Sequence, residues 1–120
     1  KLEGHSALEN VSYPFLDSHP QVAIARKQMT AGGGIITITL KGGQAAASKF
    51  LDGLKMIKIS PNLGDARSIA THPASSTHCK LTPEERAIVG ISDGLVRISI
   101  GLEHREDILN DILQALSNGQ

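Results

Sequence analysis

Arg97 is the residue whose type and position point most directly to chemistry. It stands in segment 95–100, which is otherwise almost entirely apolar and is followed by Gly101. A guanidinium is permanently charged, and in such a place it usually has an anion to bind. The sequence therefore predicts an anion-binding site around Arg97, to which the polar stretch 62–78 contributes the other half. The alternative is that Arg97 is an ordinary charge on a solvated face.

Two segments alternate apolar and polar residues, which is typical of strands with one buried face. In segment 35–40 the polar positions are Thr37 and Thr39, and in segment 95–100 they are Arg97 and Ser99. These four side chains are expected to share the polar face of one sheet. Because Ser99 and Gly101 are small, we expect space above Arg97 for a ligand or another domain to approach.

The remaining elements follow from periodicity and from turn residues. Short strands are expected near 10–13 and 56–59, with a turn at 60–62, and helices are expected over 21–29, 46–54 and 83–90. A last helix is expected to start within 103–107 and to end at 118–119. Ser18 and Pro20 provide a cap and a proline for the first helix, and Thr82, Pro83 and Glu85 form a capping box for the third. Asn118 and Gly119 are a C-cap signature. Together these predict an α+β fold, a two-layer sandwich of mainly antiparallel sheet with helices on one face, in a single domain 1–120.

Other reactive residue types are better explained by structure. His72, His78 and Cys79 lack the paired spacing of a metal site, so a hydrogen-bonding role is expected and no metal site is predicted. Cys79 and His78 are adjacent, and neighbouring side chains of an extended segment point apart, so they are no nucleophile–base pair. The glycine runs 32–34 and 42–43 lack the spacing of phosphate loops and are expected to be turns. The acids of segment 103–107 are expected to be solvated at a helix start.

Composition excludes several classes of function. Twelve basic and twelve acidic residues balance, and the aromatics are Tyr13, Phe15 and Phe50, so neither a nucleic-acid surface nor a membrane surface is predicted. No apolar run is long enough to span a membrane. A single cysteine favours a reducing compartment, the cytoplasm. The chain opens on Lys1 in a polar stretch, which indicates a piece of something longer.

Two long stretches resemble a known family. They are NLGDARSIATHPASSTH (62–78) and TPEERAIVGISDGLVRISIGLEHREDILNDILQAL (82–116), and the resemblance extends back through segments 31–34, 18–21 and 11–14. The chain resembles the C-terminal domain of the pyridoxal-phosphate enzymes of cysteine and methionine metabolism. Within that family it is most similar to O-acylhomoserine (O-succinylhomoserine) sulfhydrylases, with methionine gamma-lyases and cystathionine gamma-synthases close behind.

The resemblance implies roles for particular residues. Arg97 would bind the α-carboxylate of an amino-acid substrate, for which a planar fork of donors is well suited. Asn62 falls where the family commonly has a serine before Leu-Gly, and with Leu63 it would complete the substrate-binding set. Ser60 is the other candidate for the serine's role. No residue of this chain is assigned a catalytic role.

The resemblance also implies what lies elsewhere. The Schiff-base lysine and the residues that hold pyridoxal phosphate would belong to a large upstream domain, so this piece alone would bind no cofactor and be inactive. The intact enzyme, a transferase or lyase acting on O-acylhomoserine or by γ-elimination, would be a cytoplasmic homotetramer. The alternative from another class is a stand-alone regulatory module that binds amino acids.

Overall fold

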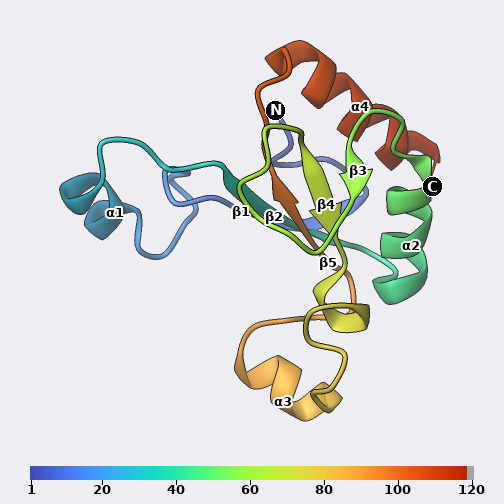
Figure 1. The fold of residues 1–120 in the computed structure, drawn as a ribbon. Helices are drawn as coiled ribbons and strands as arrows, with labels where there is room; N and C mark the ends of the chain where they lie inside the picture. The colour runs from blue at the N-terminus through green and yellow to red at the C-terminus, as the bar shows by residue number, and fades with distance from the viewer. Residues whose placement is uncertain (119–120) are drawn as a thin grey trace.

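The computed structural model describes residues 1–118, and its centre is one five-stranded sheet (Figure 1). The strands lie in the order β1-β2-β5-β4-β3. Their bounds are Leu8–Ser12 (β1), Ile35–Leu40 (β2), Lys58–Ile59 (β3), Ile69–Thr71 (β4) and Leu95–Ser99 (β5). Neighbouring strands are antiparallel except for β3 and β4, which are parallel. The prediction of a mainly antiparallel sheet in an α+β fold is confirmed.

The sheet buries one face against two helices. Ile38 of β2 faces Val96 of β5 and Val11 of β1, and all three side chains are buried. Helices α2 (Gly43–Gly53) and α4 (Arg105–Asn118) lie side by side over this face, at the right of Figure 1. The apolar stripe predicted for the last helix is confirmed, since its residues either belong to the core or pack against it. The expected C-cap residue Gly119 lies outside the described residues.

Small residues set the distance between α2 and α4. Ala47 and Ala115 are fully buried, and a side chain added at Gly53 would touch Ala115 at 3.4 Å. Phe50, also fully buried, fills the space between the helices and the sheet. The predicted helix at 46–54 is therefore confirmed, with its start at Gly43. Gly42 has a φ of 99°, which explains the glycine turn expected there.

Two short helices stand away from the sheet. They are α1 (Val22–Gln28) and α3 (Pro83–Ile88), at the left and bottom of Figure 1, and neither contains a buried residue. The capping box predicted for α3 is confirmed: Thr82 Oγ1 accepts from the Glu85 N–H and the Glu85 carboxylate accepts from the Thr82 N–H. Both helices owe little to apolar burial.

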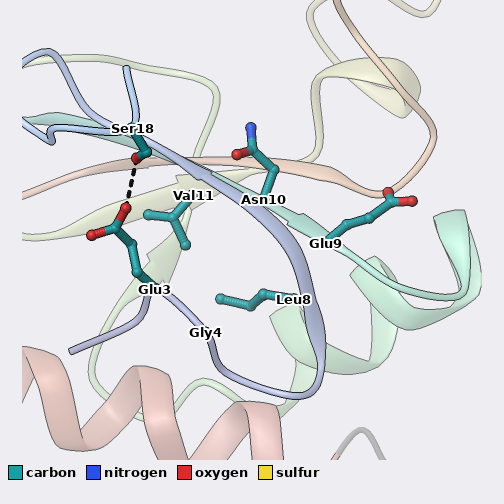
Figure 2. Close-up of a pocket in the computed structure, with 7 residues that line it drawn as sticks. All are labelled: Glu3, Gly4, Leu8, Glu9, Asn10, Val11 and Ser18. Atoms are coloured by element: carbon teal, nitrogen blue, oxygen red, sulfur yellow. Dashed lines mark hydrogen bonds between the residues drawn. The ribbon is translucent and has the colours of Figure 1, made fainter. Parts of the chain in front are cut away.

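The cap predicted for α1 is wrong. Helix α1 begins after Gln21, and no side chain caps it. The turn at Pro20 leaves Ser18 too far upstream, and Ser18 donates instead to Glu3 at 2.6 Å. Figure 2 shows this bond at the rim of a small pocket beside β1, lined also by Leu8, Glu9 and Val11. The bond ties the N-terminal segment to the segment that leads into α1.

Strand β4 is not predicted by the sequence patterns. Its three residues are all buried, so they show no alternation, and the strand is too short to reveal a pattern. A single 3-10 turn, η1 (Pro73–Ser75), follows it directly. The strand expected at 56–59 is reduced to the two residues of β3. Within residues 1–118, no helix combines the length and apolar character needed to cross a bilayer.

Candidate functional site

Arg97 lies on β5, the middle strand of the sheet, on the face opposite α2 and α4. Its register partners are Thr37 of β2 on one side and Thr71 of β4 on the other. The side chain is half-buried, whereas the neighbours Val96 and Ile98 point into the core. The expected polar face is therefore confirmed at Thr37 and Arg97, and Arg97 occupies its centre.

The guanidinium of Arg97 contacts the segment that precedes β4. Nη2 donates to the carbonyl oxygen of Pro61 at 2.9 Å and to that of Asn62 at 3.4 Å. These contacts reach across 36 and 35 positions of the chain. They fix one nitrogen of the fork, and two carbonyl dipoles do not neutralise a full charge.

The other arginines of the chain differ from Arg97 in one respect. Each has a carboxylate within 4.0 Å, in the pairs Arg26–Asp17, Arg67–Asp65, Arg86–Asp93 and Arg105–Glu106. Among residues 1–118, no carboxylate lies within that distance of Arg97. A half-buried guanidinium without an acidic partner is suited to bind an anion supplied from outside the domain.

Two of the predicted site residues, Arg97 and Asn62, are in contact, and the contact is made by the main chain of Asn62. Asn62 meets Arg97 with its carbonyl group, and its N–H donates to Ser60 Oγ at 3.3 Å. The side chains of Asn62 and Leu63 are both exposed. Ser60 is half-buried, and because its Oγ accepts in this contact its hydroxyl can still donate, so both residues remain candidates for the serine's role.

The expectation of open space above Ser99 and Gly101 is wrong. Ser99 is buried, and its Oγ accepts from the N–H of Gly64 at 3.2 Å. A side chain built at Gly101 would lie 2.4 Å from the main chain of Arg67 and Ser68. The chain's own segment 61–68 therefore covers this end of the polar face, and the two small residues admit that segment rather than a ligand.

Glu103 fastens the end of this covering segment. Its carboxylate accepts from the Ser68 N–H at 2.7 Å and from the Ser68 hydroxyl at 2.9 Å. Ser68 Oγ accepts in turn from the Gly101 N–H at 2.9 Å. We call these three residues the Ser68–Glu103 latch. The main-chain N–H of Ser68 is the chief cause that lowers the pKa of Glu103, so the latch is made by a carboxylate. Glu103 is thus more than the solvated helix-starting acid expected from the sequence.

Residues 1–117 match the model of one protein family, described as Cys/Met metabolism PLP-dependent enzymes, where PLP is pyridoxal phosphate. The match covers nearly the whole chain. The chain belongs to the Cys/Met metabolism PLP-dependent enzyme family. The resemblance inferred from the sequence motifs is therefore confirmed.

Curated members of the Cys/Met family share close to half of their residues with this chain. An O-succinylhomoserine sulfhydrylase from Mycobacterium tuberculosis is 47% identical over 97% of the chain, and an L-methionine gamma-lyase from Pseudomonas putida is 51% identical over 91%. Among solved structures, a cystathionine gamma synthase from Xanthomonas oryzae in complex with aminoacrylate and cysteine superimposes with a TM-score of 0.92. It is 43% identical over 98% of the chain.

The match covers only part of these Cys/Met enzymes. The chain spans 30% of the sulfhydrylase, 27% of the lyase and 30% of the synthase structure. The shared fold is therefore that of one portion of a larger enzyme.

The lysines of the chain do not fit the attachment of the Cys/Met family's cofactor. A lysine that binds PLP covalently must lie in an enclosed site, where its pKa is lowered and water is excluded. Every lysine of the described chain is exposed. Residues 1–118 by themselves give none of these lysines the enclosed surroundings that covalent attachment requires.

His72 has hydrogen-bond partners that explain it without chemistry. His72 is buried, with Nε2 2.6 Å from the Asp93 carbonyl and Nδ1 2.7 Å from Ser75 Oγ. Because a carbonyl only accepts, Nε2 carries the hydrogen, and in the neutral ring Nδ1 accepts from the serine. Cys79 is exposed. No group of three metal-ligating side chains occurs within residues 1–118, and the hydrogen-bonding role expected for His72 is confirmed.

Asp111 is a buried acid that the sequence reading overlooked. Its carboxylate accepts from the consecutive N–H groups of Lys55, Met56 and Ile57 at 2.8–2.9 Å, and from Gln114 at 3.0 Å. Burial raises the pKa of Asp111, but these donors together outweigh it and hold the pKa below its ordinary value. The available signal was an aspartate between Ile108 and Ile112, on the apolar stripe of α4.

Proposed function

We propose that this chain is the C-terminal, substrate-binding domain of a PLP-dependent enzyme of sulfur amino-acid metabolism, and that Arg97 binds the α-carboxylate of its substrate. The observation that supports this assignment is the position of Arg97. It is centred on the polar face, half-buried, and has none of the acidic partners, among residues 1–118, that the other arginines have. The carboxylate of a substrate would supply the negative charge beside Arg97 that residues 1–118 do not provide.

Asn62 and Leu63 complete the proposed substrate site. Pro61 and Asn62 accept from Nη2 of Arg97, while Nε and Nη1 have no hydrogen bond within residues 1–118 and are free to donate to an incoming carboxylate. The exposed Asn62 amide can donate a further hydrogen bond to the substrate. Leu63 follows Asn62 directly, and its side chain is also exposed. A carboxylate that accepts from Nη2 together with Nε or Nη1 would be fixed in both position and orientation.

The reaction we propose for the intact enzyme is γ-replacement on an O-acylhomoserine, giving homocysteine. The similarity to a sulfhydrylase supports it, and the similarity to methionine gamma-lyases supports γ-elimination as the second candidate. PLP supplies the electron sink for such chemistry when it is bound. This chain's contribution is to bind and orient the substrate.

The remainder of the intact protein would hold PLP. The exposed lysines of this chain support this division, as does the share of the relatives that the chain spans. The chain alone should be inactive and should bind no stoichiometric PLP. Absorbance titration with PLP tests this: labelling at or below that of a lysine-matched unrelated protein is expected, and saturation at one equivalent would contradict it.

The intact protein is proposed to be a cytoplasmic homotetramer whose C-terminal domain contacts its own upstream domain. Large apolar side chains that a free domain leaves exposed support such contacts: Ile24 on α1, Ile88 on α3, and Leu102. Light scattering on the intact protein tests the assembly, and a monomer would contradict it. A stand-alone amino-acid-binding module is the alternative of another class, and turnover by the intact protein excludes it.

The central experiment compares Arg97→Ala with Arg105→Ala in the intact protein. Arg105 is exposed and paired with Glu106, so its loss is the matched control. Losing a charge-assisted contact of about 1.5–3 kcal/mol should lower kcat/KM for the amino-acid substrate about 10- to 150-fold. Near-normal kinetics for Arg97→Ala would refute the assignment.

A further inference from the structure

We infer that Glu103 is a positioning residue for the carboxylate site: through Ser68 it fixes segment 61–68, whose carbonyl groups set the orientation of the Arg97 guanidinium. This inference rests on the proposed role of Arg97. Glu103 itself is not proposed to touch the substrate. It acts on the main chain that touches Arg97.

The orientation of the Arg97 guanidinium depends on segment 61–68. Both of its hydrogen bonds within residues 1–118 go to carbonyl oxygens, of Pro61 and Asn62. A guanidinium is planar, so fixing Nη2 fixes the direction of the other donors. Any shift of these carbonyls therefore changes the direction in which a carboxylate can be bound.

Segment 61–68 is attached to the rest of the fold at few points. Segment 61–68 contains no helix or strand. Gly64 has a φ of 74°, a conformation that residues other than glycine rarely adopt. After the contact with Arg97, it is fastened by the Gly64 N–H to Ser99 and by the Leu102 N–H to the Ala66 carbonyl. The latch at Ser68 lies directly before β4 begins at Ile69, where the Ser68 carbonyl also accepts from the Lys58 N–H at 3.2 Å.

The Ser68–Glu103 latch is a strong attachment. Glu103 binds Ser68 at two points, both shorter than 3.0 Å, and Ser68 is fully buried. Hydrogen bonds to a carboxylate are about twice as strong as neutral ones. The Gly101 N–H completes the arrangement on the strand side, so the latch joins the segment to the end of the strand that presents Arg97.

The experiment uses the intact enzyme and measures discrimination for a carboxylate. The substrate is O-succinylhomoserine or methionine, whichever is turned over. Its kcat/KM is divided by that of the analogue whose α-carboxylate is replaced by a carboxamide, which keeps the shape but not the charge. This quotient is the discrimination ratio. Glu103→Ala should lower this ratio about tenfold, since small displacements of a binding group are costly. Glu103→Gln keeps an acceptor for the Ser68 N–H and should restore most of the ratio.

Asp111→Asn is the matched control for a merely structural role. Asp111 is also an acid that binds main-chain N–H groups, but it holds segment 55–57 beneath α4. Its loss should cost stability while leaving the ratio within about twofold of wild type. If Glu103→Ala does not fold, Ser68→Ala should give a smaller fall in the ratio, because it keeps the N–H contact to Glu103 and removes only the hydroxyl's contacts to Glu103 and to the Gly101 N–H.

The outcomes separate the two proposals. If Arg97→Ala leaves the ratio unchanged, or if neither substrate is turned over, the proposed function is wrong. If Arg97→Ala removes the discrimination while Glu103→Ala and Ser68→Ala retain it in full, the role of Glu103 is wrong and that of Arg97 stands. An equal loss of ratio in Asp111→Asn would likewise reduce Glu103 to a structural residue.

Discussion

Arg97 and Pro61 are joined by a hydrogen bond of 2.9 Å from Nη2 to the main-chain oxygen. The contact links the central strand to a loop far away in the sequence, and because the carbonyl is a neutral acceptor it leaves the arginine's charge uncompensated. It follows that the geometry of the fork, and not only its charge, is built into the fold.

Arg97→Lys should therefore not restore the site in the intact enzyme. Lysine keeps the charge but offers no planar fork, so it cannot bind Pro61 and a substrate carboxylate in fixed relative positions. We expect kcat/KM to fall at least about tenfold, closer to Arg97→Ala than to wild type. Steady-state kinetics with all three proteins checks this. Wild-type kinetics for the lysine variant would show that charge alone suffices.

Asp111→Asn should destabilise the chain by about 2–3 kcal/mol of unfolding free energy, because an NH₂ group then faces main-chain N–H donors in a buried position. Urea titration measures the change. Asp52→Asn is the control, since Asp52 is exposed at the end of α2 and its change should stay within about 0.5 kcal/mol. Equal effects of the two substitutions would contradict the role given to Asp111.

The same carboxylate predicts a pH dependence. The pKa of Asp111 is lower in the folded chain than its ordinary value, so the folded state favours the ionised form. Its contribution to stability is present above the unfolded pKa of about 3.9 and is lost as the pH falls through the lower folded value. Urea titrations from pH 6 to pH 2.5 should show this loss, and Asp111→Asn should show a shallower one. Parallel curves for the two proteins would exclude Asp111 as a cause.

Gly101→Ala should destabilise the chain, since the added methyl group would lie 2.4 Å from the main chain of Arg67 and Ser68. Separating segment 61–68 from the strand should cost about 1–3 kcal/mol of unfolding free energy. Gly34→Ala is the control, because its methyl group would meet the Ile100 carbonyl at an ordinary 3.5 Å. Thermal unfolding of both variants checks this, and a Gly101→Ala protein as stable as Gly34→Ala would contradict the close approach.

The sequence predicted the elements that local patterns determine. Strands β2 and β5 alternate apolar and polar residues after their first position, and the capping box of α3 and the stripe of α4 are local signals, so all were found. Strand β4 was missed because it is buried on both sides, and its place in the sheet is set by long-range pairing with β5. Periodicity cannot report a strand that has no solvent-facing side.

The candidate site was predictable in its central residue but not in its supports. Arg97 is conspicuous because a charge interrupts an apolar strand. Glu103 and Asp111 were not, since both bind main-chain N–H groups from segments 35 to 56 positions away, which no local pattern reveals. The space expected above Ser99 was wrong for the same reason, because the segment that fills it comes from elsewhere in the chain.

Thr82→Ala should loosen α3 without unfolding the chain. The threonine forms the capping box with Glu85, and α3 has no buried residue, so its stability depends on these local bonds. Loss of the cap should cost about 1 kcal/mol locally and raise amide exchange in α3 roughly fivefold. Global unfolding measured by urea should change little, because the core lies between α2, α4 and the sheet. Thr77→Ala, at an exposed position outside any helix, is the control. A global loss of stability equal to the local one would show that α3 is coupled to the core, contrary to its position at the edge of the fold (Figure 1).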